Sequence, residues 1–186
     1  MAEQKKFLQL ELPIINQKID LLTINEKDLL GRTVKIDLTR RLRGKSLEAI
    51  FKIKQEDEKL KIQIYRLHLL GYFIRRIMRK SVNYVEDSFS EECKNAVLKI
   101  KFFLITRKKV SGVIRKALRE KAKDEVKMEI KEKDYEEIFS DIISGKLQKS
   151  LSLKLKKIYP LAFCDIRDIY VEKEKEEIKV QEEKIK

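Results

Sequence analysis

Alternation of apolar and polar side chains near the start of the chain is the pattern that most restricts its fold. Apolar residues occupy every second position in residues 34–38, 47–53 and 60–64. Because successive side chains of a strand point to opposite faces, each segment is expected to be a half-buried β-strand. The short polar connections between the segments predict antiparallel pairing. A sheet that curls into a barrel-like shape would avoid a long exposed edge.

Later segments change to the helical period of 3.6 residues. Ser111 has a side chain suited to capping the helix that follows it. Asp134 and Glu137 have the spacing of a capping box, and Gly145 is expected to end the helix that they begin. Amphipathic helices are expected in residues 71–80, 111–123 and 135–143, and further strands in residues 7–15, 82–85 and 96–105.

Residues 145–171 combine a basic amphipathic helix with a strand. Leu147, Leu151, Leu155 and Ile158 follow one helical face. Lysines fill much of the remaining surface, and no acidic residue occurs between positions 146 and 161. Pro160 disfavours helical backbone at the residue before it, so the helix should end there. The β-branched and aromatic residues that follow predict a strand.

Together these segments predict an α+β fold, with a small antiparallel barrel-like β-sheet, packed basic amphipathic helices and a C-terminal strand. Residues 1–28 are expected to form an N-terminal extension. Residues 29–171 are expected to form a single domain, with its barrel-like part in 29–106 and its helical part in 110–171. Residues 172–186 contain too few apolar side chains to fold alone and are expected to be a charged tail.

The balance of charge indicates a polyanionic partner. The 186 residues include 44 Lys and Arg against 31 Asp and Glu, which gives a formal net charge of +13. Nucleic acid is favoured over a membrane because no basic cluster flanks a long apolar segment. The chain lacks the apolar run of a membrane helix and the apolar core of a signal peptide, so we expect a soluble, cytoplasmic protein.

No pattern in the sequence indicates catalysis. The chain has no glycine-rich phosphate loop, no nucleophile elbow and no metal-ligand spacing. His68 is the only histidine, and Cys93 and Cys164 lie far apart without a CxxC motif. A hydrogen-bonded structural role, or a position next to a phosphate, fits His68 better than the role of a catalytic base without a partner. We therefore expect no enzymatic activity, catalytic residue, cofactor, metal or small-molecule substrate.

Basic side chains recur in clusters that would suit RNA phosphate. A single cluster is often only a solvated surface, but several clusters on one side would make a binding face. Tyr65, Tyr72, Tyr84 and Tyr159 could stack on bases or pack in the core. The candidate RNA contacts are Arg40, Arg41, Arg43, Lys45, Arg75, Arg76, Arg79, Lys80, Arg107, Lys108, Lys109, Arg115, Lys116, Arg119, Lys149, Lys156 and Lys157.

Several short motifs of the chain resemble those of a known protein family. The residue strings that carry the resemblance are Leu30-Gly31-Arg32-Thr33-Val34, Gly145-Lys146-Leu147, Lys156-Lys157-Ile158-Tyr159-Pro160-Leu161 and Ile166-Arg167 with Val171. These strings resemble the motifs of the S-three-A-e (e-S-one) family of archaea and eukaryotes. The resemblance extends over residues 29–171 and includes the basic segments near Arg79 and Arg107.

The resemblance implies a structural constituent of the small ribosomal subunit, located on its platform near the messenger exit. The implied partners are small-subunit ribosomal RNA, neighbouring platform ribosomal proteins and mRNA near the exit, and the implied location is the cytoplasmic ribosome. The length of 186 residues fits the archaeal members. Two alternatives stay open: a free RNA-binding module, acting as an RNA chaperone or translation regulator, and a basic adaptor for an acidic protein.

Overall fold

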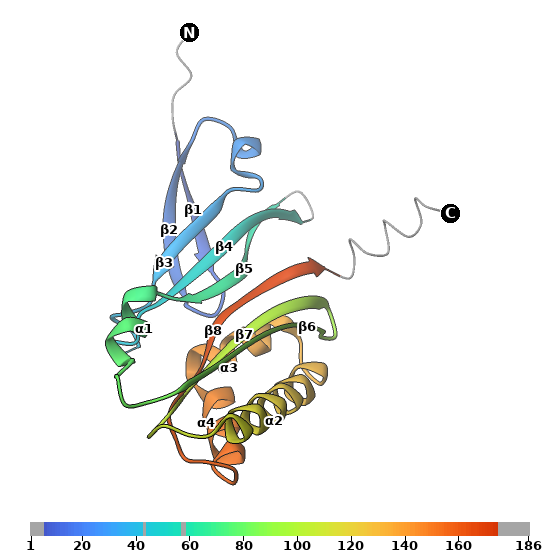
Figure 1. The fold of residues 1–186 in the computed structure, drawn as a ribbon. Helices are drawn as coiled ribbons and strands as arrows, with labels where there is room; N and C mark the ends of the chain where they lie inside the picture. Colours follow the sequence, from blue (N-terminus) through green and yellow to red (C-terminus); the bar gives the residue numbers. More distant parts are fainter. Residues whose placement is uncertain (1–5, 43, 57–58, 175–186) are drawn as a thin grey trace.

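Eight strands and four α-helices make up the part of the chain described by a computed structural model, residues 6–42, 44–56 and 59–174 (Figure 1). The strands form one two-stranded and one six-stranded antiparallel sheet. The predicted α+β class is therefore confirmed. Most of the expected charged tail, residues 175–186, lies outside the described residues.

The six-stranded sheet has the order β3-β4-β5-β8-β7-β6. Its last strand in the chain, β8, pairs with both β5 and β7 and so occupies the centre. Within the described chain β3 and β6 each pair on one side only, so the hydrogen-bond ladder is open and does not close into a barrel. The bounds are β3 (Thr33–Asp37), β4 (Leu47–Glu56), β5 (Lys59–Leu69), β6 (Tyr84–Glu92), β7 (Ala96–Thr106) and β8 (Leu161–Glu174).

The N-terminal residues form a hairpin of β1 (Lys6–Leu12) and β2 (Gln17–Thr23). The turn between them places Ile14 and Asn16 at φ of 71° and 51°. The predicted strand 7–15 is thus shorter than expected, and β2 was missed. Leu12 and Ile15 are fully buried in the main core, so the described part of the expected N-terminal extension packs against the rest of the molecule.

The helices begin close to the predicted signals, but the helix predicted over residues 111–123 extends to Lys131, and the helix predicted over residues 71–80 ends at Ile77. They are α1 (Gly71–Ile77), α2 (Gly112–Lys131), α3 (Tyr135–Ser144) and α4 (Lys146–Leu155). Ser111 caps α2, since its Oγ accepts a hydrogen bond from the amide of Ile114 at 3.5 Å. Gly145 ends α3 in the left-handed conformation, with φ of 76°. Asp134 precedes α3, but its side chain accepts no capping hydrogen bond, so the predicted capping box is not formed.

The basic helix α4 ends earlier than its apolar stripe predicted. Leu147, Leu151 and Leu155 are buried, as expected. Ile158 lies beyond the helix and is 38% exposed. The amides of Ile158 and Tyr159 both donate to the carbonyl of Leu155, at 2.9 and 3.2 Å. These bonds form a tight turn that provides a partner for a carbonyl at the end of the helix. The turn leads the chain into β8.

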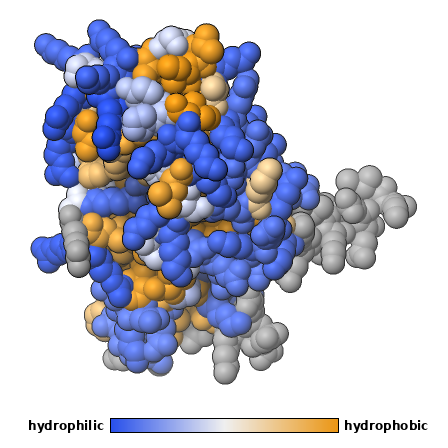
Figure 2. All heavy atoms as spheres, turned by 90° about the horizontal axis from the view of Figure 1, so that it is seen from below, coloured by the Kyte–Doolittle hydropathy of each residue, from blue (hydrophilic) through white to orange (hydrophobic). Residues whose placement is uncertain are grey.

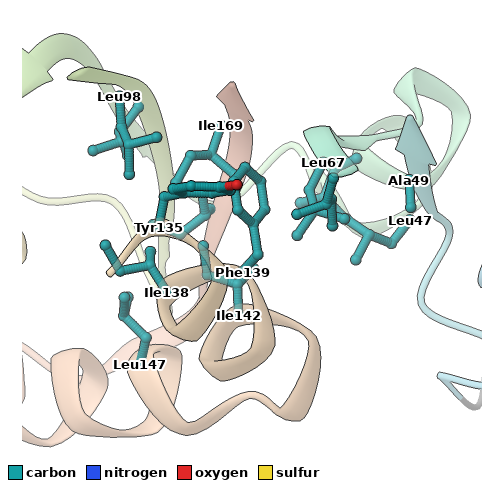
Figure 3. Close-up of a cluster of buried hydrophobic side chains, with 14 of the residues drawn as sticks. Leu47, Ala49, Leu67, Leu98, Tyr135, Ile138, Phe139, Ile142, Leu147 and Ile169 are labelled. Atoms are coloured by element: carbon teal, nitrogen blue, oxygen red, sulfur yellow. The ribbon is translucent and has the colours of Figure 1, made fainter. Parts of the chain in front are cut away.

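One face of the six-stranded sheet packs against α3 (Figure 3). Phe139 and Ile138 are completely buried and belong to the same cluster of buried side chains as Leu67 of β5 and Ile169 of β8. The cluster reaches Leu98 of β7. A single hydrophobic core therefore joins the predicted barrel-like part to the predicted helical part. Burial of apolar area at this junction contributes favourable free energy to the fold.

Candidate nucleic-acid interface

Antiparallel pairing collects the basic connections of the chain at one end of the six-stranded sheet. β3, β5 and β7 finish at this end, and β4, β6 and β8 begin there. The chain segments at this end are residues 38–46, 70–83, 107–111 and 156–160, and none of them contains Asp or Glu. We call these four segments the basic end. Its exposed cations are Arg40, Arg41, Arg75, Arg76, Arg79, Lys80, Arg107, Lys108, Lys109, Lys156 and Lys157.

Further predicted cations lie outside the basic end, on the helices α2 and α4. Arg115, Lys116 and Arg119 are exposed on the first turns of α2, which starts directly after residues 107–111. Lys116 also lies 3.8 Å from Glu120, in a solvent-exposed pair that contributes little to stability. Lys149 is exposed on α4, and a rise of about 1.5 Å per residue places it roughly 10 Å before Lys156.

Lys45 is an exception among the predicted RNA contacts. Its Nζ lies 2.7 Å from Oδ2 and 2.9 Å from Oδ1 of Asp165, a buried residue of β8. A buried carboxylate requires a positive or hydrogen-bonding partner, and Lys45 supplies one. Its assignment to RNA is therefore corrected to an internal ion pair. Arg43, another predicted contact, lies outside the described residues.

Arg41 and Arg76 hold the basic end together while staying exposed. Arg41 donates a hydrogen bond to the carbonyl of Ile15 in the N-terminal hairpin. Arg76 donates to the carbonyl of Gly44 at 3.0 Å, and its guanidinium lies 5.1 Å from the centre of the Phe73 ring. These bonds connect the loop before β4 with the hairpin and with α1. The arginines therefore fix the relative positions of segments that are distant in sequence.

Hydrogen bonds also position the loop of Arg107. The amide of Thr106 donates to the carbonyl of Asn83 at 2.9 Å, and the Thr106 hydroxyl donates to the carbonyl of Lys108 at 2.7 Å. The Asn83 side chain accepts from the amide of Val110 at 2.8 Å. Thr106 is completely buried. The basic residues of this loop thus extend from a backbone that is tied down on both sides.

The structure brings two predicted basic segments to one cavity. Arg79, which follows α1, and Arg107, which follows β7, both line a hollow of about 370 Å³. Phe163, at the start of β8, also lines it. Sequence reasoning found the two arginines but not the cavity, because the cavity depends on where β8 enters the sheet.

Two of the four tyrosines proposed for stacking are available at the basic end. Tyr72 on α1 and Tyr84 at the start of β6 are 49% and 53% exposed. Tyr84 stacks on Phe103, with ring centres 6.1 Å apart. Tyr65 is half-buried, with the ammonium of Lys52 5.9 Å from its ring centre, and Tyr159 is half-buried. Base stacking is therefore accessible mainly to Tyr72 and Tyr84.

Arg66 is a basic residue that sequence reasoning did not select, and its role is internal. Its guanidinium grips the buried carboxylate of Asp168 through two hydrogen bonds of 2.7 Å. Hydrogen bonding to Asp168 raises the pKa of Arg66. The same carboxylate lies 3.6 Å from Nδ1 of His68. His68 therefore lies beside an ion pair on the sheet, but its buried Nδ1 makes no hydrogen bond, so the hydrogen bond expected for this histidine is not formed at that atom.

The opposite end of the sheet carries mixed charge. Glu92 and Glu172 are exposed there beside Lys94 and Lys173. The excess of positive charge is therefore concentrated at one end of the strands. Seen from below, the molecular surface is largely hydrophilic, with separate apolar patches between the charged side chains (Figure 2).

Other kinds of site have little support in the part of the chain that the structure describes. No group of three or more His, Cys, Asp or Glu side chains there could hold a metal ion. No helix in residues 6–42, 44–56 and 59–174 is long and apolar enough to span a membrane. Burial, with a smaller effect of the Asp165 charge, raises the pKa of the Cys164 thiol to about 12. A thiol with such a raised pKa is a poor nucleophile at neutral pH.

Comparison with protein families supports the resemblance found in the motifs. The model of the Ribosomal S3Ae family matches residues 2–175 of the 186-residue chain. The match contains both the segment at 30–34 and the helix-to-strand segment at 145–171. A comparison with curated proteins gives no match. The chain belongs to the Ribosomal S3Ae family and is a ribosomal protein of the small subunit.

Proposed function

We propose that this ribosomal protein holds small-subunit ribosomal RNA through its basic end. The observation that supports the proposal is the meeting of four connections without acidic residues at one end of the sheet. Backbone phosphates would contact the exposed lysines and arginines there. Release of counterions from RNA would drive binding, and the fixed shape of the basic end would select structured RNA.

The family resemblance supports a proposed place within the subunit. The platform near the messenger exit is the proposed location, with ribosomal RNA, neighbouring platform proteins and mRNA near the exit as partners. An association with cytoplasmic ribosomes accompanies this role. Ribosomal protein families are structural rather than enzymatic, and binding accounts for the role without catalysis.

The salt dependence of RNA binding tests the proposal. The protein should bind a small-subunit platform RNA fragment with a log–log salt slope steeper than about −2, since each phosphate contact contributes roughly −0.7 to −0.9. The combined replacements Arg107→Ala, Lys108→Ala and Lys156→Ala should lower the magnitude of the slope by about 2. Filter binding or fluorescence anisotropy at several salt concentrations would measure the slopes.

A matched control removes the same charge elsewhere. Lys27, Lys94 and Lys173 are exposed at the opposite end of the strands. Their combined replacement by Ala gives the same net charge but should leave the slope nearly unchanged. If the magnitude of the salt slope falls equally in the two triple variants, diffuse positive charge attracts RNA, and not the basic end. Release of the native protein from small subunits during high-salt washing would instead favour the free RNA-binding alternative.

A further inference from the structure

We propose that the cavity lined by Arg79 and Arg107 receives a single unstacked nucleobase of the bound RNA. The inference rests on the proposed RNA-binding function and adds a position and a chemical group to it. The cavity lies between the connection from α1 to β6, the end of β7 and the start of β8. A base that enters there would be recognised by shape and stacking, while phosphates stay outside.

The lining of the cavity suits a flat aromatic group. Ile77, Val82, Ile105 and Phe163 supply apolar surface. A volume of about 370 Å³ lies at the low end of small-ligand pockets, which range over roughly 300–1,000 Å³. Aromatic and apolar side chains hold bases that are splayed out of single strands, bulges and loops. Paired bases remain stacked in a duplex and could not enter.

The walls of the cavity are held in place before any ligand binds. Phe163 packs against Phe73 of α1, with ring centres 5.9 Å apart and ring planes at 59°. Ile105 is buried, and the next residue, Thr106, is bonded to Asn83 as described above. A preformed pocket loses little entropy when it is filled. The cavity is therefore a feature of the folded protein, not one that RNA must open.

The charges around the cavity favour RNA over an apolar side chain of a protein. None of the lining residues is acidic, and Arg79 and Arg107 come from separate segments of the basic end. Lys80 and Lys108 are the exposed neighbours of these arginines. A nucleotide in an RNA chain presents a flat base, whose faces stack on apolar surfaces, with a phosphate on each side of its sugar. Apolar walls with cations from two segments match that arrangement.

The test compares a short RNA duplex that has one bulged nucleotide with the same duplex fully paired. Wild-type protein should bind the bulged RNA about tenfold more tightly, which is a typical effect of stacking one base. A 2-aminopurine at the bulge should change its fluorescence on binding, because its stacking partner changes. Arg79→Ala with Arg107→Ala should weaken binding of both RNAs.

Filling the cavity gives the decisive variant. Ala162 is exposed and lines the cavity, so Ala162→Trp should block a base while leaving the charges intact. The preference for bulged RNA should disappear, while affinity for the paired duplex stays the same. Ser88→Trp places the same side chain at an exposed position of β6 outside the cavity and should keep the preference. If Ala162→Trp fails to fold, Ser81→Trp blocks the cavity from another segment.

Each result decides the inference. No preference for the bulge in the wild type, or a preference that survives Ala162→Trp, would overturn the base-binding cavity while leaving RNA binding by the basic end intact. Unchanged RNA binding by Ala162→Trp together with poor incorporation into small subunits would assign the cavity to a protein side chain. Absence of binding to either RNA would reject the proposed function itself, and the cavity inference with it.

Discussion

Asp165 accepts hydrogen bonds from three segments of the chain and so holds them together. Its carboxylate accepts hydrogen bonds from Lys45 before β4, from Gln148 of α4 at 2.9 Å and from the amide of Ile166 at 2.8 Å. The carboxylate is buried, so its charge is balanced inside the protein and not by water. The residue links the basic end to the helix that packs behind it.

Asp165→Ala should therefore destabilise the protein. The change leaves the ammonium of Lys45 without its carboxylate partner and removes one of the two hydrogen bonds of the Gln148 amide, which also donates to the carbonyl of Ile142. The loss of one member of a buried ion pair costs about 3 kcal/mol. Urea unfolding would measure the change. Asp124→Ala removes the same side chain from an exposed position of α2 and should change the free energy of unfolding by no more than about 0.5 kcal/mol. Equal effects would contradict the role of Asp165.

Cys164 should make stability depend on alkaline pH. Burial raises the pKa of its thiol from 9.0 to about 12. The folded protein therefore keeps the neutral thiol while the unfolded chain loses its proton above pH 9. The resulting stabilisation is complete below pH 9 and is lost as pH rises toward 12, by about 1.4 kcal/mol at pH 10.

The contribution of Cys164 is measured by comparing how the free energy of unfolding changes with pH in the wild type and in a variant without the thiol. Unfolding of the wild type and of Cys164→Ala would be compared at pH 8 and pH 10, because other groups titrate equally in both. The wild type should lose more stability than the variant between these two values. An equal loss of stability in the two proteins would show that the thiol is ionised as easily in the folded protein as in the unfolded chain.

Single residues also mark the limit of sequence reasoning about the candidate site. Lys45 and Lys108 both occur in basic loops, and nothing in the local sequence separates them. The difference arises from Asp165, a residue 120 positions away from Lys45. Exposure of the other predicted cations was easier to predict, because lysine and arginine rarely become buried without a partner.

Among the elements, α4 shows how an apolar stripe fixes a helix on the core. Leu151 is buried, whereas Leu153 on the same helix is 70% exposed. Leu151→Ala should lower the free energy of unfolding by about 3 kcal/mol, because it removes buried methyl groups and leaves a cavity. Leu153→Ala should change it by less than about 0.5 kcal/mol. Denaturant unfolding of the two variants gives the comparison, and similar losses would mean that α4 does not pack as described.

The helix and strand ends that were predicted most accurately from the sequence are those with strong local signals. Pro160 and Gly145 mark a strand start and a helix end, and Ser111 marks a helix start; each signal acts through its own backbone geometry or hydrogen bond. β2 was missed although Ile19 and Leu21 alternate with polar residues. Ile19 and Leu21 are only half-buried, so the pattern of β2 is weak. The order of strands in the main sheet could not be predicted, because it depends on pairing between distant segments.

On the scale of the whole molecule, β8 lies between β5 and β7 in the six-stranded sheet. It therefore links the group β3, β4 and β5 to the group β7 and β6. β5 pairs with β8 through Arg66, Leu67 and His68, and β7 pairs with β8 along most of its length. Without β8 the strands β3, β4 and β5 would be separated from β6 and β7. The fold should therefore unfold as one cooperative unit only when β8 is present.

Shortened chains test this dependence. A chain that ends at Pro160 should lose cooperative unfolding and dispersed amide resonances, because both inner strands keep an unpaired edge. A chain that ends at Glu174 retains all eight strands and should unfold close to the full-length protein. A peptide of residues 161–174 should restore structure to the shorter chain. Cooperative unfolding of the chain that ends at Pro160 would contradict the central role of β8.

The position of β8 also sets the order of events during synthesis. β5 is complete about 100 residues before β8 has been translated, a delay of roughly 5–20 s at typical elongation rates. During that time the open edges of β5 and β7 are available to chaperones, and the basic segments have no fixed arrangement. A nascent chain of this protein can thus attract RNA by charge before it can recognise a particular shape. Accurate incorporation into a new subunit must wait for nearly the whole protein to be made.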